Sequence, residues 1–264
     1  MIKFPKIMGI LNITEDSFSD GGDFLNLERA VDKALEMIDS GVDIIDIGAE
    51  SSRPGAKEIP EKIELERVSS LIKKIKSLRP SSFISIDTTK YEVARISLEL
   101  GAGMLNDISG LRFEPKLAQL CKEYDVPIIL MHMKGEPKSM QSNPIYENVV
   151  SEVFDFLQKQ KELALSEGAK KVLVDVGIGF GKNDTHNKTL LQNIEKFNNI
   201  APQVLGISRK SFIGRGFGID NPKDRDMATI FFHSLLLDAN IEIIRVHDIK
   251  SALLLKNIFT YLHS

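Results

Sequence analysis

Residues 171–175 read Lys-Val-Leu-Val-Asp, a short run of strand-forming residues that stops at a carboxylate. The same arrangement recurs eight times along the chain, each time with an apolar run followed by a polar residue. The runs and the polar residues that end them are 7–11 with Asn12, 42–48 with Glu50, 83–86 with Asp87, 103–105 with Asn106, 126–131 with His132, 171–174 with Asp175, 204–207 with Ser208, and 241–244 with Arg245. A segment with helical spacing lies between successive runs, and eight strand–helix units predict a (β/α)8 TIM barrel. The chemistry of such barrels takes place at the C-terminal ends of the strands, so the polar ends are candidate active-site residues.

The chain of 264 residues has the length of one barrel, and we expect a single α/β domain over residues 1–264. Three connections that leave the C-terminal ends of strands are longer than a barrel requires, and long loops at that end are often functional. The expected helices cover residues 27–40, 61–78, 90–100, 115–124, 146–167, 188–198, 223–240 and 250–262, and the long connections cover residues 12–25, 48–60 and 132–145.

Composition and charge narrow the class of protein. Hydrophobic residues make up 42% and charged residues 27%, which is ordinary for a globular protein. The net charge of −3 gives no reason to expect a nucleic acid or a membrane surface as partner. Cys121 is the only cysteine, so no intrachain disulfide can form, and we expect a buried thiol in a cytoplasmic protein.

Three strand ends carry groups that suit a flat, nitrogen-rich ring. Asp87, Asn106 and Asp175 would project into the barrel mouth and accept N–H groups from a ring edge such as that of a 2-amino-4-oxo-pyrimidine. Lys210 is a suitable donor to a ring carbonyl or nitrogen. The alternative is that these carboxylates only pair with Lys or Arg to support the strand ends. For all three together this is less favourable, because burying acceptors without donors is costly.

The last two strands end in cationic residues that suit an anion. Ser208-Arg209-Lys210-Ser211 follows the seventh run, and Arg245 and His247 end the eighth. By the two-residue period of a strand, Arg245 and His247 point the same way. Phosphate sites in these barrels often lie after strands 7 and 8, which favours an anion site over a structural histidine.

The remaining motifs carry weaker signals. Asn12 offers an amide oxygen to a hard metal ion, and the segment from it to Gly22 has the composition of either a lid or a solvated loop. Arg53, in Ser51-Ser52-Arg53-Pro54-Gly55, suits a phosphate or carboxylate but also an ordinary surface turn. Glycines alternate at 177, 179 and 181, which lets backbone approach a flat ligand, and Phe180 between them is either an aromatic wall or core filler.

Taken together, these segments resemble the dihydropteroate synthase family of pterin-binding barrels. The resemblance runs from Met8-Gly9-Ile10-Leu11-Asn12 to Arg245-Val246-His247-Asp248 and covers nearly the whole chain. It also includes Asp46-Ile47-Gly48, Ser85-Ile86-Asp87-Thr88, Asn106-Asp107, Met131-His132-Met133-Lys134-Gly135, Gly179-Phe180-Gly181-Lys182 and Ser208–Ser211.

The resemblance implies a transferase of folate (tetrahydrofolate) biosynthesis. It would join 6-hydroxymethyl-7,8-dihydropterin pyrophosphate to p-aminobenzoate, with Mg²⁺ as cofactor and sulfonamides as inhibitors. By analogy, Lys210, Asp175, Arg245 and His247 would be catalytic. The pterin would contact Asp87, Asn106, Asp175 and Lys210. Pyrophosphate would contact Asn12, Arg245 and His247, and Mg²⁺ would contact Asn12. The p-aminobenzoate would lie among Phe18, Ser52, Arg53, Pro54, Phe180, Lys210 and Ser211.

Two other readings stay open from the sequence. A methyltransferase pterin-binding domain would share the barrel and the pterin pocket but would need no site for pyrophosphate or an arylamine. A non-catalytic pterin-binding homologue would serve as a sensor or partner. The family also implies a homodimer, formed through helices of the C-terminal part of the barrel. His132, at the fifth strand end, has no assigned role.

Overall fold

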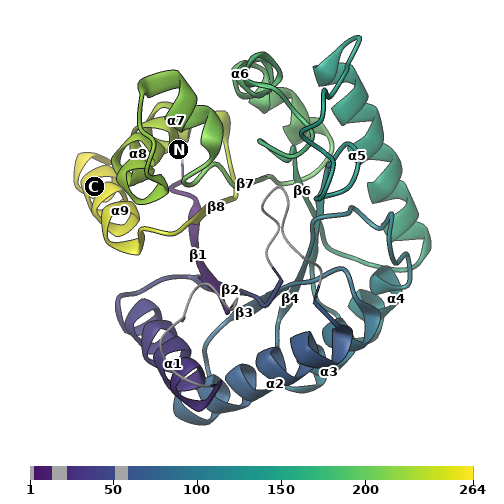
Figure 1. Ribbon diagram of the computed structural model, residues 1–264, viewed down its shortest axis with the longest axis vertical. Coiled ribbons are helices and arrows are strands. Elements are labelled where there is room, and N and C mark those ends of the chain that lie inside the picture. The colour runs from purple at the N-terminus through teal and green to yellow at the C-terminus, as the bar shows by residue number, and fades with distance from the viewer. Residues whose placement is uncertain (1–2, 14–22, 51–58, 264) are drawn as a thin grey trace.

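The computed structural model describes residues 3–13, 23–50 and 59–263. At its centre, strands run parallel to one another in the order β6-β5-β4-β3-β2-β1-β8-β7, and helices surround them (Figure 1). The strands are β1 Lys6–Asn12, β2 Ile44–Gly48, β3 Ile84–Asp87, β4 Met104–Asp107, β5 Ile128–Met131, β6 Val172–Asp175, β7 Val204–Leu205 and β8 Ile243–Val246. The eight apolar runs of the sequence are therefore eight strands, as predicted.

The sheet closes on itself where β6 meets β7. Val174 forms an isolated parallel bridge with Gln203, and the Val174 N–H donates to the Pro202 carbonyl over 3.0 Å. The first and last strands also pair directly, since Met8 of β1 lies opposite Arg245 of β8. The (β/α)8 barrel expected from the sequence is thus confirmed.

The interior of the barrel changes from apolar to polar along each strand. A buried cluster takes one residue from each of seven strands: Met8, Ile44, Met104, Ile129, Leu173, Val204 and Ile243. Side chains two residues apart face the same way. Directly above the cluster, toward the C-terminal ends of the strands, therefore stand Asp46, Asn106, Asp175 and Arg245. This two-residue step is what places the polar strand ends over a closed hydrophobic floor.

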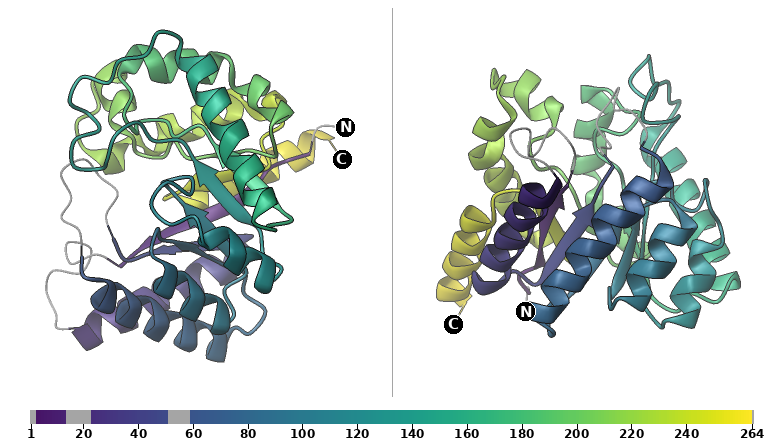
Figure 2. Two further views of the ribbon diagram at one scale, coloured as in Figure 1. Left: turned by 90° about the vertical axis from the view of Figure 1, so that its right-hand side faces the viewer. Right: turned by 60° about the horizontal axis from the view of Figure 1, so that its bottom comes forward.

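The helices pack their apolar faces onto the outside of the strands, and Figure 2 shows them around the barrel from two further sides. They are α1 Asp23–Asp39, α2 Glu61–Leu78, α3 Tyr91–Glu99, α4 Leu117–Glu123, α5 Val149–Ser166, α6 Asp184–Gln192, α7 Ser211–Phe217, α8 Asp226–Leu235 and α9 Ile249–His263. Cys121 is buried on α4, as expected. In the described part of the chain, no helix combines the length and the apolar character that crossing a membrane requires.

The expected helices of the second half needed correction. The helix expected over 188–198 begins earlier, because Asn183 accepts the His186 N–H over 2.8 Å and caps α6, and its end is the 3-10 helix Ile194–Asn199. The segment 223–240 is not one helix: α8 lies between the 3-10 helices Pro222–Arg225 and Leu237–Ala239. Helix α7 was not predicted, because Gly214 and Gly216 interrupt its seven residues.

Candidate active site

Most of the site residues proposed from the sequence lie in the described part of the chain. Asp87, Asn106 and Asp175 stand at the ends of β3, β4 and β6, and Asn12 ends β1. Ser211 is the first residue of α7 and Lys210 directly precedes it, and Phe180, Arg245 and His247 are also described. Phe18, Ser52, Arg53 and Pro54 fall outside the described residues.

Arg245 is the centre of a charge network across the mouth. Its Nε donates to Asp46 Oδ2 over 2.6 Å, and its Nη2 donates to Asp87 Oδ2 over 2.8 Å. Asn106 Nδ2 donates to the same Asp46 oxygen over 3.0 Å. Burial alone would lower the pKa of Arg245, but the charges of Asp46 and Asp87 outweigh it and raise that pKa. Arg245 is therefore a permanent cation among carboxylates.

Asp87 has an unusual proton affinity for a carboxylic acid. Burial raises its pKa to about 7, and the nearby carboxylates of Asp46, Glu64 and Asp107 add to the rise while Arg245 opposes it. Asp87 is thus poised to take either protonation state near neutrality, and a ligand that donates N–H groups would favour the carboxylate.

Asp175, Lys210 and Phe180 form the opposite side of the mouth. Asp175 Oδ1 accepts the Gly177 N–H over 2.7 Å, and burial raises the pKa of Asp175 although Lys210 opposes the rise. Burial lowers the pKa of Lys210 to about 8, and Asp175 limits the fall. The Lys210 Nζ donates to the Ile178 carbonyl and lies 4.5 Å from the centre of the Phe180 ring. A half-buried cation, a carboxylate and an aromatic face thus meet here.

In the loop after β7, the side chains of the adjacent residues Arg209 and Lys210 point in different directions. Ser208 Oγ lies 2.9 Å from His247 Nδ1 and accepts the His247 N–H over 3.1 Å, which joins the ends of β7 and β8. Arg209, with φ of 60°, turns away from the mouth and makes a two-point pair with Asp226 of α8 at 2.6 Å. Of the adjacent cations, only Lys210 serves the mouth.

Asn12 borders a space that a glycine keeps open. Asn12 pairs in register with Gly48 of β2. A Cβ atom at Gly48 would lie 3.6 Å from Asn12 Oδ1 and 3.3 Å from Asp87 Cβ. The described residues contain no cluster of three His, Cys, Asp or Glu side chains that could hold a metal. An ion here would need ligands from a bound substrate as well as from the chain.

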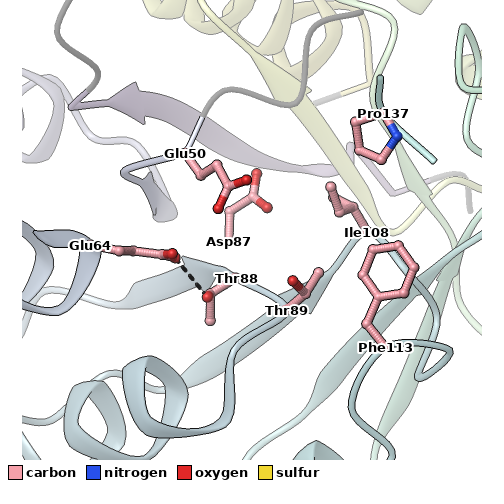
Figure 3. A pocket seen from close by; sticks show the side chains of 8 residues that line it. All are labelled: Glu50, Glu64, Asp87, Thr88, Thr89, Ile108, Phe113 and Pro137. Atoms are coloured by element: carbon pink, nitrogen blue, oxygen red, sulfur yellow. Dashed lines mark hydrogen bonds between the residues drawn. The ribbon is translucent and has the colours of Figure 1, made fainter. Parts of the chain in front are cut away.

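A pocket opens beside Asp87 at the ends of β3 and β4. Figure 3 shows the side chains of Glu50 and Asp87 approaching each other above Thr88 and Thr89, with Ile108, Phe113 and Pro137 on the other side. Glu64, at the floor, accepts the Thr88 hydroxyl over 2.7 Å. The pocket therefore lies on the Asp87 side of the barrel mouth.

Sequence reasoning missed three buried charged residues that shape this site. Asp46 is fully buried inside an apolar run, where the two-residue period that it shares with Ile44 and Gly48 would have placed it in the barrel interior. Glu64 and Lys182 are also buried. No signal in the sequence distinguishes Glu64 from the other acidic residues of α2.

The chain is similar to known proteins over nearly its full length. The pattern of a family described as "Pterin binding enzyme" matches residues 8–247. The dihydropteroate synthase of Haemophilus influenzae is 42% identical over 254 residues, which cover 95% of this chain and 91% of that protein. The dihydropteroate synthase of Escherichia coli K12 is 41% identical over 252 residues, covering 94% and 88%.

Solved structures agree in fold. A Yersinia pestis dihydropteroate synthase in a sulfonamide drug complex superimposes with a TM-score of 0.91 at 36% identity, covering all of this chain and 96% of that chain. A Xanthomonas albilineans dihydropteroate synthase with 4-aminobenzoic acid gives a TM-score of 0.91 at 35% identity, covering all of this chain and 94% of that chain.

Proposed function

This chain belongs to the dihydropteroate synthase family of pterin binding enzymes, and from that premise we propose how its barrel mouth performs the family's transfer reaction. The reaction joins 6-hydroxymethyl-7,8-dihydropterin pyrophosphate and p-aminobenzoate, and it releases pyrophosphate and 7,8-dihydropteroate. The observation that carries the proposal is the arrangement of Asp87, Asn106 and Asp175 on three strand ends, with Lys210 beside Asp175.

The pterin is proposed to lie over the hydrophobic floor with its N–H edge toward the acceptors. Asp175 and Asp87 accept ring N–H groups, Asn106 both donates and accepts, and Lys210 donates to the ring carbonyl or a ring nitrogen. The Asn106 amide is already oriented by its bond to Asp46. These groups lie on strand ends, which hold them more rigidly than loops would.

The departing pyrophosphate is proposed to lie between β1 and β8. The pairs with Asp46 and Asp87 use Nε and Nη2 of Arg245, which leaves Nη1 to contact a pyrophosphate oxygen. His247 is oriented by Ser208 at the same end. Mg²⁺ fits here on chemical grounds, because the Asn12 oxygen faces the space kept open by Gly48 and Mg²⁺ commonly combines few protein oxygens with phosphate oxygens and water. Mg²⁺ bound there would neutralise part of the charge of the leaving group.

The arylamine is proposed to lie on the Phe180 side, beside Lys210 and the exposed Ser211. Phe18, Ser52, Arg53 and Pro54 are proposed to complete this part of the site by family analogy. Sulfonamides, which resemble p-aminobenzoate, are proposed as inhibitors that occupy the same place. The Yersinia pestis relative forms such a sulfonamide complex.

The bond changes then follow from the charges. The C–O bond to pyrophosphate breaks and the oxygen keeps the electron pair, while the electron-rich dihydropterin ring shares the positive charge that develops on carbon. Asp175 stabilises this charge by its position next to the ring. The neutral arylamine nitrogen forms the new C–N bond and then loses one proton to the released pyrophosphate or to water. No strong base is required, because the anilinium formed by this attack is acidic.

The test is an assay of pyrophosphate release that requires both substrates. Lys210→Ala is expected to fold and lose turnover, because it removes the half-buried cation that is proposed to contact the pterin. Lys76→Ala is the matched control, since its Nζ donates to the Ser82 carbonyl over 2.6 Å at the opposite end of the barrel. Unchanged release by Lys210→Ala would sink the proposed site. Pterin binding without release would favour the sensor alternative.

A homodimer in the cytoplasm is proposed as the working form. Large apolar side chains are exposed on neighbouring helices of the C-terminal part, with Phe217 on α7, Phe231 and Leu235 on α8, and Leu254 on α9. Such surfaces usually mark association sites. Sedimentation of the protein with Phe231→Lys tests this, and a monomer is expected for the variant only.

The single buried thiol of Cys121 fits a reducing compartment.

A further inference from the structure

Lys182 is a fully buried lysine whose described hydrogen bonds include no carboxylate. Its Nζ lies 2.8 Å from His132 Nδ1 and donates to the Gly177 and Phe180 carbonyls, each over 3.0 Å. A weaker contact reaches the His132 carbonyl at 3.4 Å. An ammonium has three N–H groups, so these acceptors satisfy it completely. Burying such a group is expensive, and the chain recovers the cost only if the enclosing backbone is held in this shape.

His132 contributes a specific atom to this cluster. Burial lowers the pKa of His132 to about 2, and the positive charge of Lys182 adds to the fall, so the ring is neutral. Burial lowers the pKa of Lys182 well below its usual range, and in its protonated form Lys182 can only donate, so that His132 Nδ1 is then the acceptor and Nε2 carries the ring proton. The ring is itself packed against Phe156, with ring centres 4.9 Å apart. The strand-end residue without an assigned role is thus a fixed acceptor.

The loop that Lys182 holds cannot move independently of the end of β5. Gly177 has φ of 67°, and a Cβ atom there would lie 1.8 Å from the His132 carbonyl oxygen. Gly181 has φ of 61°, and a Cβ atom there would lie 2.2 Å from the Lys134 carbonyl oxygen. The alternating glycines therefore serve a close backbone contact between two loops.

The same loop contacts the proposed reaction groups. Lys210 Nζ donates to the Ile178 carbonyl, and the Phe180 ring lies 4.5 Å from that nitrogen. The Phe180 N–H donates to the Gly177 carbonyl over 3.0 Å, so one carbonyl binds both Lys182 and the backbone of Phe180. A shift of the Gly177 peptide would move Phe180 and, through Ile178, Lys210.

We propose that Lys182 and His132 are positioning residues of the transfer reaction, because together they fix residues 177–181 in the shape that places Phe180 and Lys210. The predicted kinetic effect of this inference rests on the proposed function. The predicted structural effect, a loop that is rigid even when no substrate is bound, does not.

The experiment compares two substitutions at His132 that are similar in size, of which only one supplies a hydrogen-bond acceptor. In His132→Asn the amide oxygen can replace Nδ1 as acceptor, whereas His132→Leu has no acceptor, and both lose the ring contact with Phe156. The unfolding free energy is expected to fall in both variants, and to fall further in His132→Leu, because that variant leaves one N–H of the buried ammonium without its acceptor. The KM values for pterin pyrophosphate and p-aminobenzoate are expected to rise about tenfold more in His132→Leu than in His132→Asn, with a smaller change in kcat.

Lys182→Met removes the ammonium and is expected to raise both KM values as His132→Leu does. Lys76→Met is the control and should leave both KM values unchanged, because Lys76 donates to the distant Ser82 carbonyl. Amide hydrogen exchange at Phe180 is expected to speed up in His132→Leu and Lys182→Met only. Equal KM values and equal Phe180 exchange in the two His132 variants would overturn the inference, whether or not Lys182→Met folds. Absence of turnover in the unmodified protein would refute the proposed function and leave the exchange result to decide the positioning role.

Discussion

Arg245 of β8 and Asp87 of β3 meet across the barrel mouth, with 2.8 Å between Nη2 and Oδ2. Their strands are separated by β2 and β1 in the sheet. The residue proposed to hold pyrophosphate is therefore bonded to the residue proposed to grip the pterin. Any ligand that draws Arg245 toward a phosphate oxygen changes the charge felt by Asp87, so the two ends of the first substrate are electrostatically linked.

Replacing Arg245 is expected to affect stability as well as turnover. Arg245→Met leaves the fully buried Asp46 and the mostly buried Asp87 without their cation, and breaking a buried pair in this way costs about 3–5 kcal/mol. Urea unfolding and pyrophosphate release measure the two effects. The exposed pair of Arg215 with Asp184 is the control, because Arg215→Met should cost less than about 1 kcal/mol. Similar stability losses in the two variants would contradict the central role of Arg245.

The raised pKa of Asp87 predicts a pH dependence of stability. Its pKa is about 7 in the folded protein and has an ordinary value of 3.8, so between these values the folded state binds the additional proton. The stability that this group contributes is fully present below pH 3.8 and is lost as the pH rises through 7. Asp87→Asn should remove this decline, of at most about 1.4 kcal/mol per pH unit, from urea unfolding curves. Parallel curves for both proteins would contradict a raised pKa.

Lys90 is expected to hold the two described ends of the second long connection. Its Nζ donates to Glu50 and to the buried Glu64, each over 2.6 Å, and to the Ile59 carbonyl over 2.9 Å. Lys90→Met would leave Glu64 buried without its cation and should cost about 3 kcal/mol in unfolding free energy. The KM for p-aminobenzoate should rise more than that for the pterin, since residues 50 and 59 flank the segment with Arg53.

Glu50→Gln is the matched comparison for Lys90, because it removes one partially exposed partner and leaves the Glu64 pair intact. We expect a stability loss of less than about 1 kcal/mol in this variant. A loss as large as that of Lys90→Met would show that Glu50, and not Glu64, is the partner that matters.

The strand ends could be predicted from the sequence because they depend on a local two-residue period. The runs before Asp87, Asn106 and Asp175 form the strands expected, and the period also gives the direction of those side chains. The pairing of Asp46 with Arg245 could not be predicted, since it joins residues 199 positions apart and depends on closure of the barrel.

Helix α7 and the direction of Arg209 show a second limit. Two glycines in seven residues conceal the helical period of α7. Arg209 lies between two residues that face the mouth, its backbone is left-handed with φ of 60°, and its side chain pairs with Asp226. Such a conformation is imposed on a non-glycine residue by its surroundings, here by groups of α8 that are distant in sequence.

Asp226 is one of those groups, and it is expected to support Lys210 through Arg209. Arg209 donates two hydrogen bonds to Asp226, and Arg225 Nη1 donates to the Arg209 carbonyl over 3.0 Å, so the strained residue is held by both its side chain and its backbone. Asp226→Ala should release Arg209, displace the adjacent Lys210, and lower kcat/KM between about 10-fold and about 100-fold. Asp39→Ala is the control, since Asp39 makes the same two-point pair with Arg79 at 2.8 and 2.9 Å at the far end of the barrel. It should leave kcat/KM unchanged. Equal activity of the two variants would mean that Lys210 keeps its place without Asp226, because its contacts with Ile178 and Phe180 suffice.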